Sequence, residues 1–223
     1  MSSQHSPSQA RDGVLYIDRF TYTTPAMAAT NETTARPSAR LQILESAIIL
    51  MKQSGLTGAG INQILAHSGA PKGSLYYHFP GGKQQIAIEA LTLYAERVAI
   101  AFERALSSKQ TSADKIRALL RFVAERFEEA AFVQSCAAGA VTLDLDADAS
   151  ALQPVIETTF ASWQAVIARH LPLRSAARRR SLAGLILSTI EGAYIRGRAE
   201  QSKRPLVEAG AWLSILVQRL EDA

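Results

Sequence analysis

Residues 61–80 read INQILAHSGAPKGSLYYHFP. The pattern predicts a short helix, a tight turn around Gly69 and a second short helix that ends near His78. Leu75 and Phe79 are four residues apart, so both can anchor the second helix to a core. Two short helices joined by a glycine turn form a helix-turn-helix, which can set its second helix into the major groove of DNA.

The second helix of this motif is too short and too polar to be a core element. Its donors crowd one small surface, formed by Lys72, Ser74, Tyr76, Tyr77 and His78. Neighbouring residues on a helix point in different directions, so at least one of the two tyrosines must face away from the core. Two simpler interpretations stay open: the tyrosines only pack, and His78 only complements the helix dipole.

Positive charge gathers around the same motif. From Arg36 to Lys83 the chain has five Lys or Arg residues and one acid, Glu45, a surplus of four that equals the net charge of +4 for the whole chain. Binding to DNA phosphates needs positive charge at the motif. Arg40 is therefore a candidate for a peripheral phosphate contact.

Outside the motif, the sequence pattern predicts only helices. Hydrophobic residues make up 48% of the 223 residues, which suffices for a hydrophobic core. Before the motif, Ser38 can cap a helix that Gly55 ends. After it, helices are expected at about 83–106, 112–131, 134–143, 149–170, 175–201 and 205–221. We predict an all-α fold with a flexible arm (1–35), a three-helix helix-turn-helix domain (36–82) and a larger C-terminal domain (83–223).

Composition also bears on the location of the protein and its start. Cys136 is the only cysteine, so an intrachain disulfide is excluded and a reducing cytoplasm fits. No apolar run approaches the roughly 20 residues that span a bilayer, so no membrane contact is expected. We expect a soluble, cytoplasmic protein. Met27 is a candidate for the true start of translation, because the chain after it leads directly into the first helix.

The stretch GAPKGSLYYHFPGGKQQIAIEAL, residues 69–91, resembles the signature of the TetR/AcrR family of transcriptional regulators. Its Pro-Lys-Gly-Ser start and double glycine most resemble the LmrA/YxaF-like branch. The segments QSCAAGAVTLDLD (134–146) and IEGAYIRGRAEQSKRPL (190–206) resemble that branch more loosely. The strong match covers about 38–92. The resemblance implies a ligand-responsive regulator, a repressor that releases its operator when a small apolar effector binds.

The resemblance also assigns roles to residues of the motif. DNA contacts fall on the helix Lys72–His78, Gly73 included. Tyr77, His78 and Lys83 would hold phosphates, and Ser74 and Tyr76 would reach base edges or neighbouring phosphates.

One position departs from the family pattern. The family has Thr or Ser just before the first helix of the motif, where it caps the helix and touches phosphate. This chain has Gly58-Ala59-Gly60 there. Two alternatives are open: Thr57 takes that role, or a glycine caps the helix less well.

Aromatic residues populate the predicted C-terminal helices, where an ordinary core would also place them. The resemblance implies a cavity among these helices for an apolar or amphipathic effector. Its candidate lining is Phe102, Phe122, Phe127, Cys136, Phe160 and Trp163. Cys136 is expected as a small buried side chain rather than a redox sensor. The sequence shows no cluster of charged residues from which the chemical class of the ligand could be identified.

The last two predicted helices are apolar on more than one face, which favours an interface between two copies of the chain. The candidate interface residues are Leu182, Leu185, Ile186, Tyr194, Trp212, Leu213 and Leu216. Two such helices from each chain would form a four-helix interface, which the family also implies. A two-fold homodimer would present two recognition helices to a near-palindromic operator in double-stranded DNA.

Other functions find less support. Asp144, Asp146 and Asp148 alternate as at the start of a calcium loop, but Ala149 and Val155 replace its glycine and glutamate, so no metal or other cofactor is expected. Two alternatives remain beside the ligand-responsive regulator. A helical enzyme would need a nucleophile–base pair or a metal cluster, which the scattered histidines do not supply. A constitutive DNA-binding repressor would need no ligand.

Overall fold

A computed structural model describes residues 38–145 and 150–222, and all regular structure in these ranges is helical. The predicted all-α fold is therefore confirmed. The elements are α1 (Ala39–Gly58), α2 (Ile61–Ser68), α3 (Lys72–His78), α4 (Gly82–Ser107), α5 (Ser112–Glu129), α6 (Ala137–Thr142), the 3-10 turn η1 (Ser150–Leu152), α7 (Gln153–Arg169), α8 (Ala176–Glu200) and α9 (Arg204–Glu221). The arm at 1–35, the start at Met27, and Asp146 and Asp148 lie outside the described residues.

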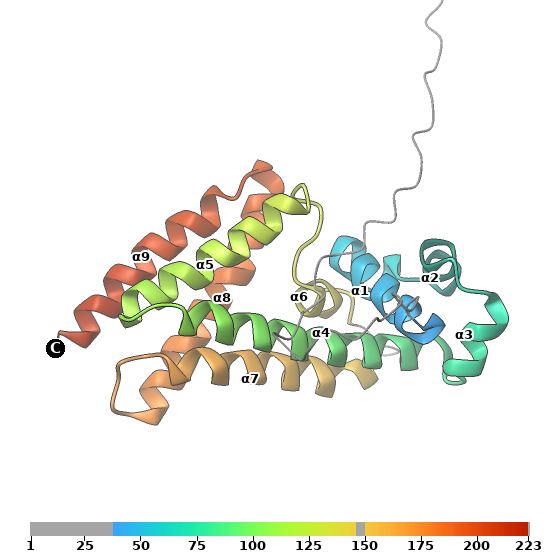
Figure 1. The fold of residues 1–223 in the computed structure, drawn as a ribbon, viewed down its shortest axis with the longest axis horizontal. Helices are drawn as coiled ribbons and strands as arrows, with labels where there is room; N and C mark the ends of the chain where they lie inside the picture. The colour runs from blue at the N-terminus through green and yellow to red at the C-terminus, as the bar shows by residue number, and fades with distance from the viewer. Residues whose placement is uncertain (1–37, 146–149, 223) are drawn as a thin grey trace, which may run out of the picture. The chain divides into compact units, whose positions relative to one another are not determined.

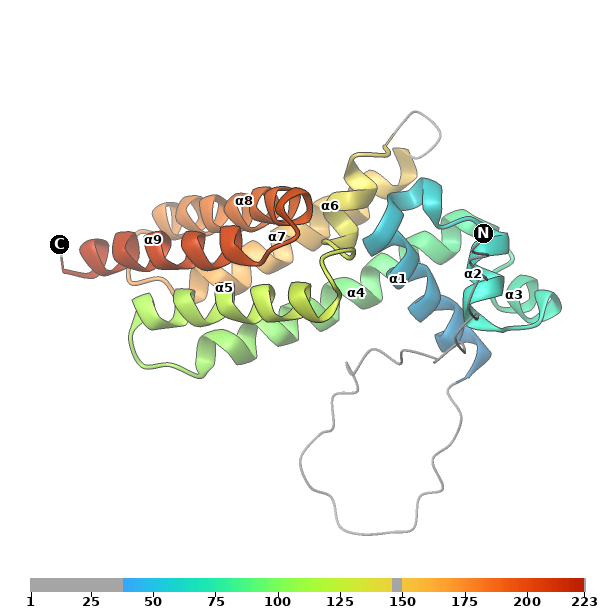
Figure 2. The same cartoon turned by 90° about the horizontal axis from the view of Figure 1, so that it is seen from above.

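Helices α1, α2 and α3 gather at one end of the long helix α4, and α5, α6 and α7 pack along the rest of it (Figure 1). Helix α8 packs on α7, and α9 packs on α5 and α8. The second view shows α5, α8 and α9 running beside one another in this C-terminal body (Figure 2). One hydrophobic cluster runs from Ile43 in α1 to Val217 in α9. Residues 37–223 form a single compact unit, so the predicted boundary after residue 82 stays a prediction.

Helix α1 begins as predicted, with Ser38 Oγ accepting a hydrogen bond from the Leu41 N–H at 3.3 Å. The helical path breaks at Gly55, whose φ is +65°, and then resumes as far as Gly58. The prediction that Gly55 simply ends the helix was therefore only half right. A Cβ at this position would lie 2.3 Å from Asp144 Oδ2, so glycine is needed both for the bend and for the close approach.

The predicted helices on either side of residue 132 are longer than the observed ones. Helix α5 ends at Glu129, and Ala131 and Phe132 have φ values of 50° and 61°. The Phe132 ring packs edge-on against Phe127, with 5.3 Å between centroids, and this contact helps hold the turn. Helix α6 consequently starts only at Ala137. No helix in the described part of the chain is long and apolar enough to cross a membrane.

Candidate DNA interface and the helical body behind it

Helix α3 is fixed to the rest of the protein by its apolar side. Leu75 and Phe79 are completely buried, as their spacing predicted. The turn that leads into α3 passes through Gly69, whose φ of 65° and ψ of 9° are left-handed, a conformation that other L-residues adopt only at a cost. The other side of α3 is therefore left at the surface.

The outer side of α3 carries the residues predicted to contact DNA. Tyr77 is 81% exposed and Tyr76 is 49% exposed, so both tyrosines point outward. Lys72 and Gly73 are exposed, and Ser74 and His78 are half-buried. The Tyr77 and His78 rings meet edge-on at 5.0 Å. Lys83 is half-buried in the first turn of α4. These groups form what we call the reading surface.

Two contacts hold the helices behind the reading surface. His67 Nδ1 lies 3.0 Å from Ser46 Oγ and joins α2 to α1. Arg40 forms an ion pair with Glu89, and its guanidinium lies 5.4 Å from the centre of the Phe79 ring. Arg40 therefore links α1 to α3 and α4 within the protein. A phosphate contact of Arg40 stays a prediction and would add to these contacts.

The structure shows which residue caps α2, while the phosphate contact of Thr57 stays a prediction. The N-cap of α2 is Gly60, and no side chain caps the helix there. The side chain of Thr57 is exposed, and its backbone N–H donates to Asp144 Oδ2 at 2.9 Å. Thr57 therefore does not cap α2. Asp144 instead anchors the segment between α1 and α2 to the loop after α6.

The candidate effector residues separate into two aromatic groups. Trp163 is the centre of the first, with Tyr94, Phe102 and Phe160 at 5.7, 6.1 and 5.6 Å between ring centroids. Its Nε1 donates to the Ala95 carbonyl of α4 at 3.0 Å.

The second aromatic group surrounds Phe127, which meets Phe132 at 5.3 Å and Tyr194 at 5.1 Å. Phe122 belongs to neither group, because its half-buried ring lies under Arg126, at 6.0 Å. Cys136 is buried at the N-cap of α6, as expected for a small apolar side chain.

A charged group inside the body escaped the sequence analysis. Burial raises the pKa of Glu191 on α8 from 4.5 to about 7, and the Cys136 thiol, which donates a hydrogen bond to the carboxylate, lowers it in part. Burial also raises the pKa values of Tyr94, Cys136 and Tyr194, and Glu191 contributes to each rise. One signal was visible in the sequence: Glu191 is the only acid between residues 181 and 199.

Several predicted dimer residues belong instead to the core of the single chain. Leu182, Ile186 and Leu213 are 8%, 0% and 7% exposed, and Tyr194 packs on Phe127. They have little surface left for a partner. Large apolar side chains at the surface of α8 and α9 are Leu185, Ile195, Val207, Trp212, Ile215 and Leu216, which we call the apolar stripe.

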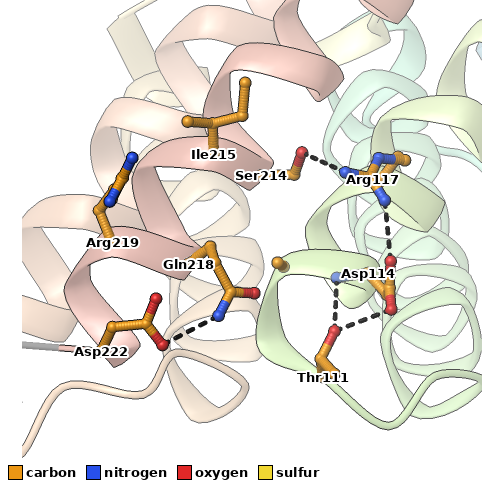
Figure 3. A pocket seen from close by; sticks show the side chains of 9 residues that line it. Thr111, Asp114, Arg117, Ser214, Ile215, Gln218, Arg219 and Asp222 are labelled. Carbon is orange, nitrogen blue, oxygen red and sulfur yellow. Dashed lines mark hydrogen bonds and ion pairs between the residues drawn. The ribbon is translucent and has the colours of Figure 1, made fainter.

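A polar groove of about 400 Å³ lies between the start of α5 and the end of α9 (Figure 3). Arg117 crosses it, donating to Ser214 Oγ at 3.0 Å and to Asp114 Oδ1 at 2.8 Å. Gln218 likewise donates to Asp222 at 3.1 Å. Because these polar groups already satisfy one another, the groove gives little support to an effector site.

The arrangement of helices and the reading surface define a DNA-binding regulator with an N-terminal helix-turn-helix. Residues 43–90 match the family model described as bacterial regulatory proteins of the tetR family. Residues 112–211 match the C-terminal domain of LmrA/YxaF-like transcriptional regulators. The HTH-type transcriptional regulator YxaF of Bacillus subtilis, itself described as uncharacterized, is 31% identical over 188 residues, which are 83% of this chain and 98% of YxaF.

Solved structures agree with these matches. A TetR transcriptional regulator from Chloroflexus aurantiacus is 26% identical, with a TM-score of 0.67 over 81% of this chain and 94% of its own. The regulator CifR, solved with 26-base-pair operator DNA, has a TM-score of 0.69 at 18% identity, over 80% of this chain and 98% of its own. The chain belongs to the TetR family of transcriptional regulators, in its LmrA/YxaF-like branch. These relatives are regulators and not enzymes, so the helical-enzyme alternative is set aside.

Proposed function

We propose that this regulator is a homodimeric repressor that binds a near-palindromic operator and releases it when a small effector enters the C-terminal body. The observation that carries the proposal is the outward orientation of the polar side of α3. Lys72, Tyr76 and Tyr77 are exposed on a helix held by two fully buried anchors. A rigid, projecting helix with donors at its surface suits the major groove.

The apolar stripe supports the dimer. Trp212 is 73% exposed, Ile195 is 65% exposed, and Leu185 and Ile215 are about half exposed. Large apolar side chains grouped on neighbouring helices mark a surface that another protein covers. A second copy of the chain, related by a two-fold axis, would cover the stripe and would carry a second reading surface. The operator would then have two similar half-sites.

Two sets of contacts could carry a signal from the body to the reading surface. Helix α4 pairs with α1 through Glu89–Arg40 and Arg97–Glu45, and it receives the Trp163 hydrogen bond from α7. Around α6, the Ser135 N–H donates to the Lys52 carbonyl at 2.9 Å. The effector would act through its different affinity for two spacings of the reading surfaces, one of which fits the operator.

The proposal can be tested in two stages with purified protein. Selection of bound genomic fragments should recover near-palindromic sites, and binding to them should survive competitor DNA. Small molecules are then titrated against the complex of protein and operator, and at least one class should release the DNA. Tight operator binding that no ligand class changes would favour the constitutive repressor. Retention on DNA without sequence preference, with a steep salt dependence, would overturn the proposal.

A further inference from the structure

Four ionisable side chains from three helices meet inside the body. Tyr94 comes from α4, Cys136 from the start of α6, and Glu191 and Tyr194 from α8. A Cβ at Gly139 would lie 2.3 Å from Glu191 Oε2, so the carboxylate points at the backbone of α6. We call these four side chains the interior cluster.

Among the residues that the structure describes, no cation pairs with the carboxylate of Glu191. The groups that shift its pKa are the surrounding protein and the Cys136 thiol, and neither of them is positively charged. Within the described residues, no ion pair involves Glu191. An ionised carboxylate in such a place is costly, and it normally either takes up a proton or acquires a positive partner.

The interior cluster retains access to solvent in spite of its depth. Burial is the main cause of the raised pKa values of Tyr94, Glu191 and Tyr194, yet each of these residues is only half-buried. Gly139, opposite the carboxylate, is half-buried as well. These residues therefore keep part of their surface accessible to solvent.

Each of the two tyrosines of the interior cluster packs against a further aromatic ring. Tyr194 is stacked edge-on with Phe127, at 5.1 Å, and Tyr94 with Trp163, at 5.7 Å. Ring faces attract cations, and the attraction strengthens where water is excluded. A carboxylate close to aromatic side chains therefore favours a ligand that combines a positive charge with apolar surface.

We propose that Glu191, with the hydroxyl groups of Tyr94 and Tyr194, recognises the effector, and that the effector is an amphipathic molecule with one positive charge, such as an aryl amine. The inference rests on the proposed function in one respect, that the protein responds to an effector at all. The charged amine would pair with the carboxylate, and the apolar part would lie against the aromatic groups. Pairing would hold Glu191 ionised and would release its proton.

The test uses three probes that share one ring and differ in charge: 1-naphthylmethylamine, 1-naphthylmethanol and 1-naphthylacetate. Calorimetric titration of the full chain at pH 8 should show the amine binding at least tenfold more tightly than the other two. Glu191→Gln should abolish this preference, so that the amine binds no more tightly than the alcohol. At pH 6.5, titrations in two buffers of different ionisation enthalpy should show proton release from the unaltered protein and none from Glu191→Gln.

A matched control removes another carboxylate from the same helix. Glu200 lies at the end of α8, where it pairs with Arg196 at 2.8 Å and with Arg204 at 3.2 Å. Glu200→Gln should keep both the preference for the amine and the proton release. If Glu191→Gln fails to fold, Tyr194→Phe keeps the charge and should weaken amine binding several-fold.

The outcomes separate this inference from the proposed function. If operator binding holds but the three probes bind equally, or the amine does not bind, the charge recognition is wrong and the regulator remains. The same conclusion follows if Glu191→Gln keeps the preference. If the unaltered protein does not bind operator DNA, the proposed function fails, whatever the probes show.

Discussion

Helices α3 and α8 place their polar and apolar residues in opposite ways. On α3 the apolar anchors Leu75 and Phe79 are fully buried, and polar side chains face outward. In the C-terminal half of α8 the large apolar Ile195 is 65% exposed, while the carboxylate of Glu191 is turned toward the backbone of α6. The pattern on α3 is the usual one for a surface helix, and α8 departs from it on both sides.

The difference indicates how many partners each helix needs. Helix α3 is stable as a surface element, and its exposed donors need DNA only for function. Helix α8 exposes apolar surface to water. It also holds a desolvated carboxylate that no cation of the described residues pairs with, and both features are unfavourable in an isolated chain. A second copy of the chain outside and a positively charged effector inside would relieve them. Each prediction below tests one side of this contrast.

The largest effect is expected from the outer side of α8 and α9. The double variant Ile195→Glu and Trp212→Glu places like charges from two chains in one apolar interface, so it should give monomers. A monomer holds only one half-site, so its affinity for the operator should fall by a factor on the order of 100 or more. Analytical ultracentrifugation and gel-shift titration measure the two effects.

A matched control for this variant is Leu143→Glu, which makes the same kind of change at a leucine that is 80% exposed near the end of α6. It should stay dimeric and bind the operator as the unaltered protein does. A dimeric Ile195→Glu and Trp212→Glu protein would show that the apolar stripe is not the interface. The exposed apolar side chains of α8 would then not be explained by a second copy of the chain.

The inner side of α8 should appear in the pH dependence of stability. Burial raises the pKa of folded Glu191 from its ordinary 4.5 to about 7, so between these pH values the folded state holds more protons than the unfolded state. The free energy of unfolding should therefore fall as the pH rises from about 4.5 to 7 and level off above, by up to about 3 kcal/mol. Glu191→Gln should remove this loss, and urea unfolding at pH 5 and pH 8 measures it.

The sign of this effect can be checked against Glu200. Hydrogen bonds from Arg196 and Arg204 lower the pKa of this carboxyl, so its contribution to stability should be present at neutral pH and disappear in acid. Glu200→Gln should therefore show the opposite trend, and a small one because the pair is exposed. If Glu191→Gln were equally stabilising at pH 5 and pH 8, burial of an ionisable carboxylate would not be the cause.

The reading surface should show a smaller and distinctive effect. Lys72→Gln removes one phosphate contact from each chain, so operator affinity at about 0.1 M salt should fall about tenfold, for matched and altered operators alike. The slope of log affinity against log salt should decrease by nearly 2 for the dimer. Lys203→Gln is the control, because Lys203 pairs with Glu128 in the body. An unchanged salt slope in Lys72→Gln would remove Lys72 from the DNA contacts.

The contrast between the helices also explains what the sequence could predict. The position of α3 follows from local signals, since Gly69 defines the turn and Leu75 and Phe79 share one face. Helix α8 carries apolar residues on more than one face, so its periodicity does not separate the face that packs within the chain from the face proposed to meet a partner. Leu182 and Leu185 are three residues apart, yet they are 8% and 51% exposed.

The interior cluster was beyond the reach of local patterns for another reason. Its members come from α4, α6 and α8, and only the packing of these helices brings Tyr94 and Cys136 to Glu191. Glu191, as the only acid in its stretch of α8, could have been singled out from the sequence as a candidate buried carboxylate. The side chains that surround it are determined by tertiary contacts and could not. The same holds for Asp144, which resembled a metal ligand in the sequence and accepts the Thr57 N–H in the structure.

The smallest effect is expected where only a hydroxyl group is lost from α3. Tyr77→Phe keeps the ring of the most exposed tyrosine and removes one hydrogen bond to phosphate, worth about 1 kcal/mol, so affinity should fall several-fold and equally for all operator variants. Tyr76→Phe should instead change the preference among operator variants if Tyr76 reads a base edge. If neither substitution changed binding, the tyrosines would meet DNA only through their rings. The outward side of α3 would then bind its partner mainly through apolar contacts, as the outward side of α8 is proposed to do, in spite of the polar groups that α3 carries.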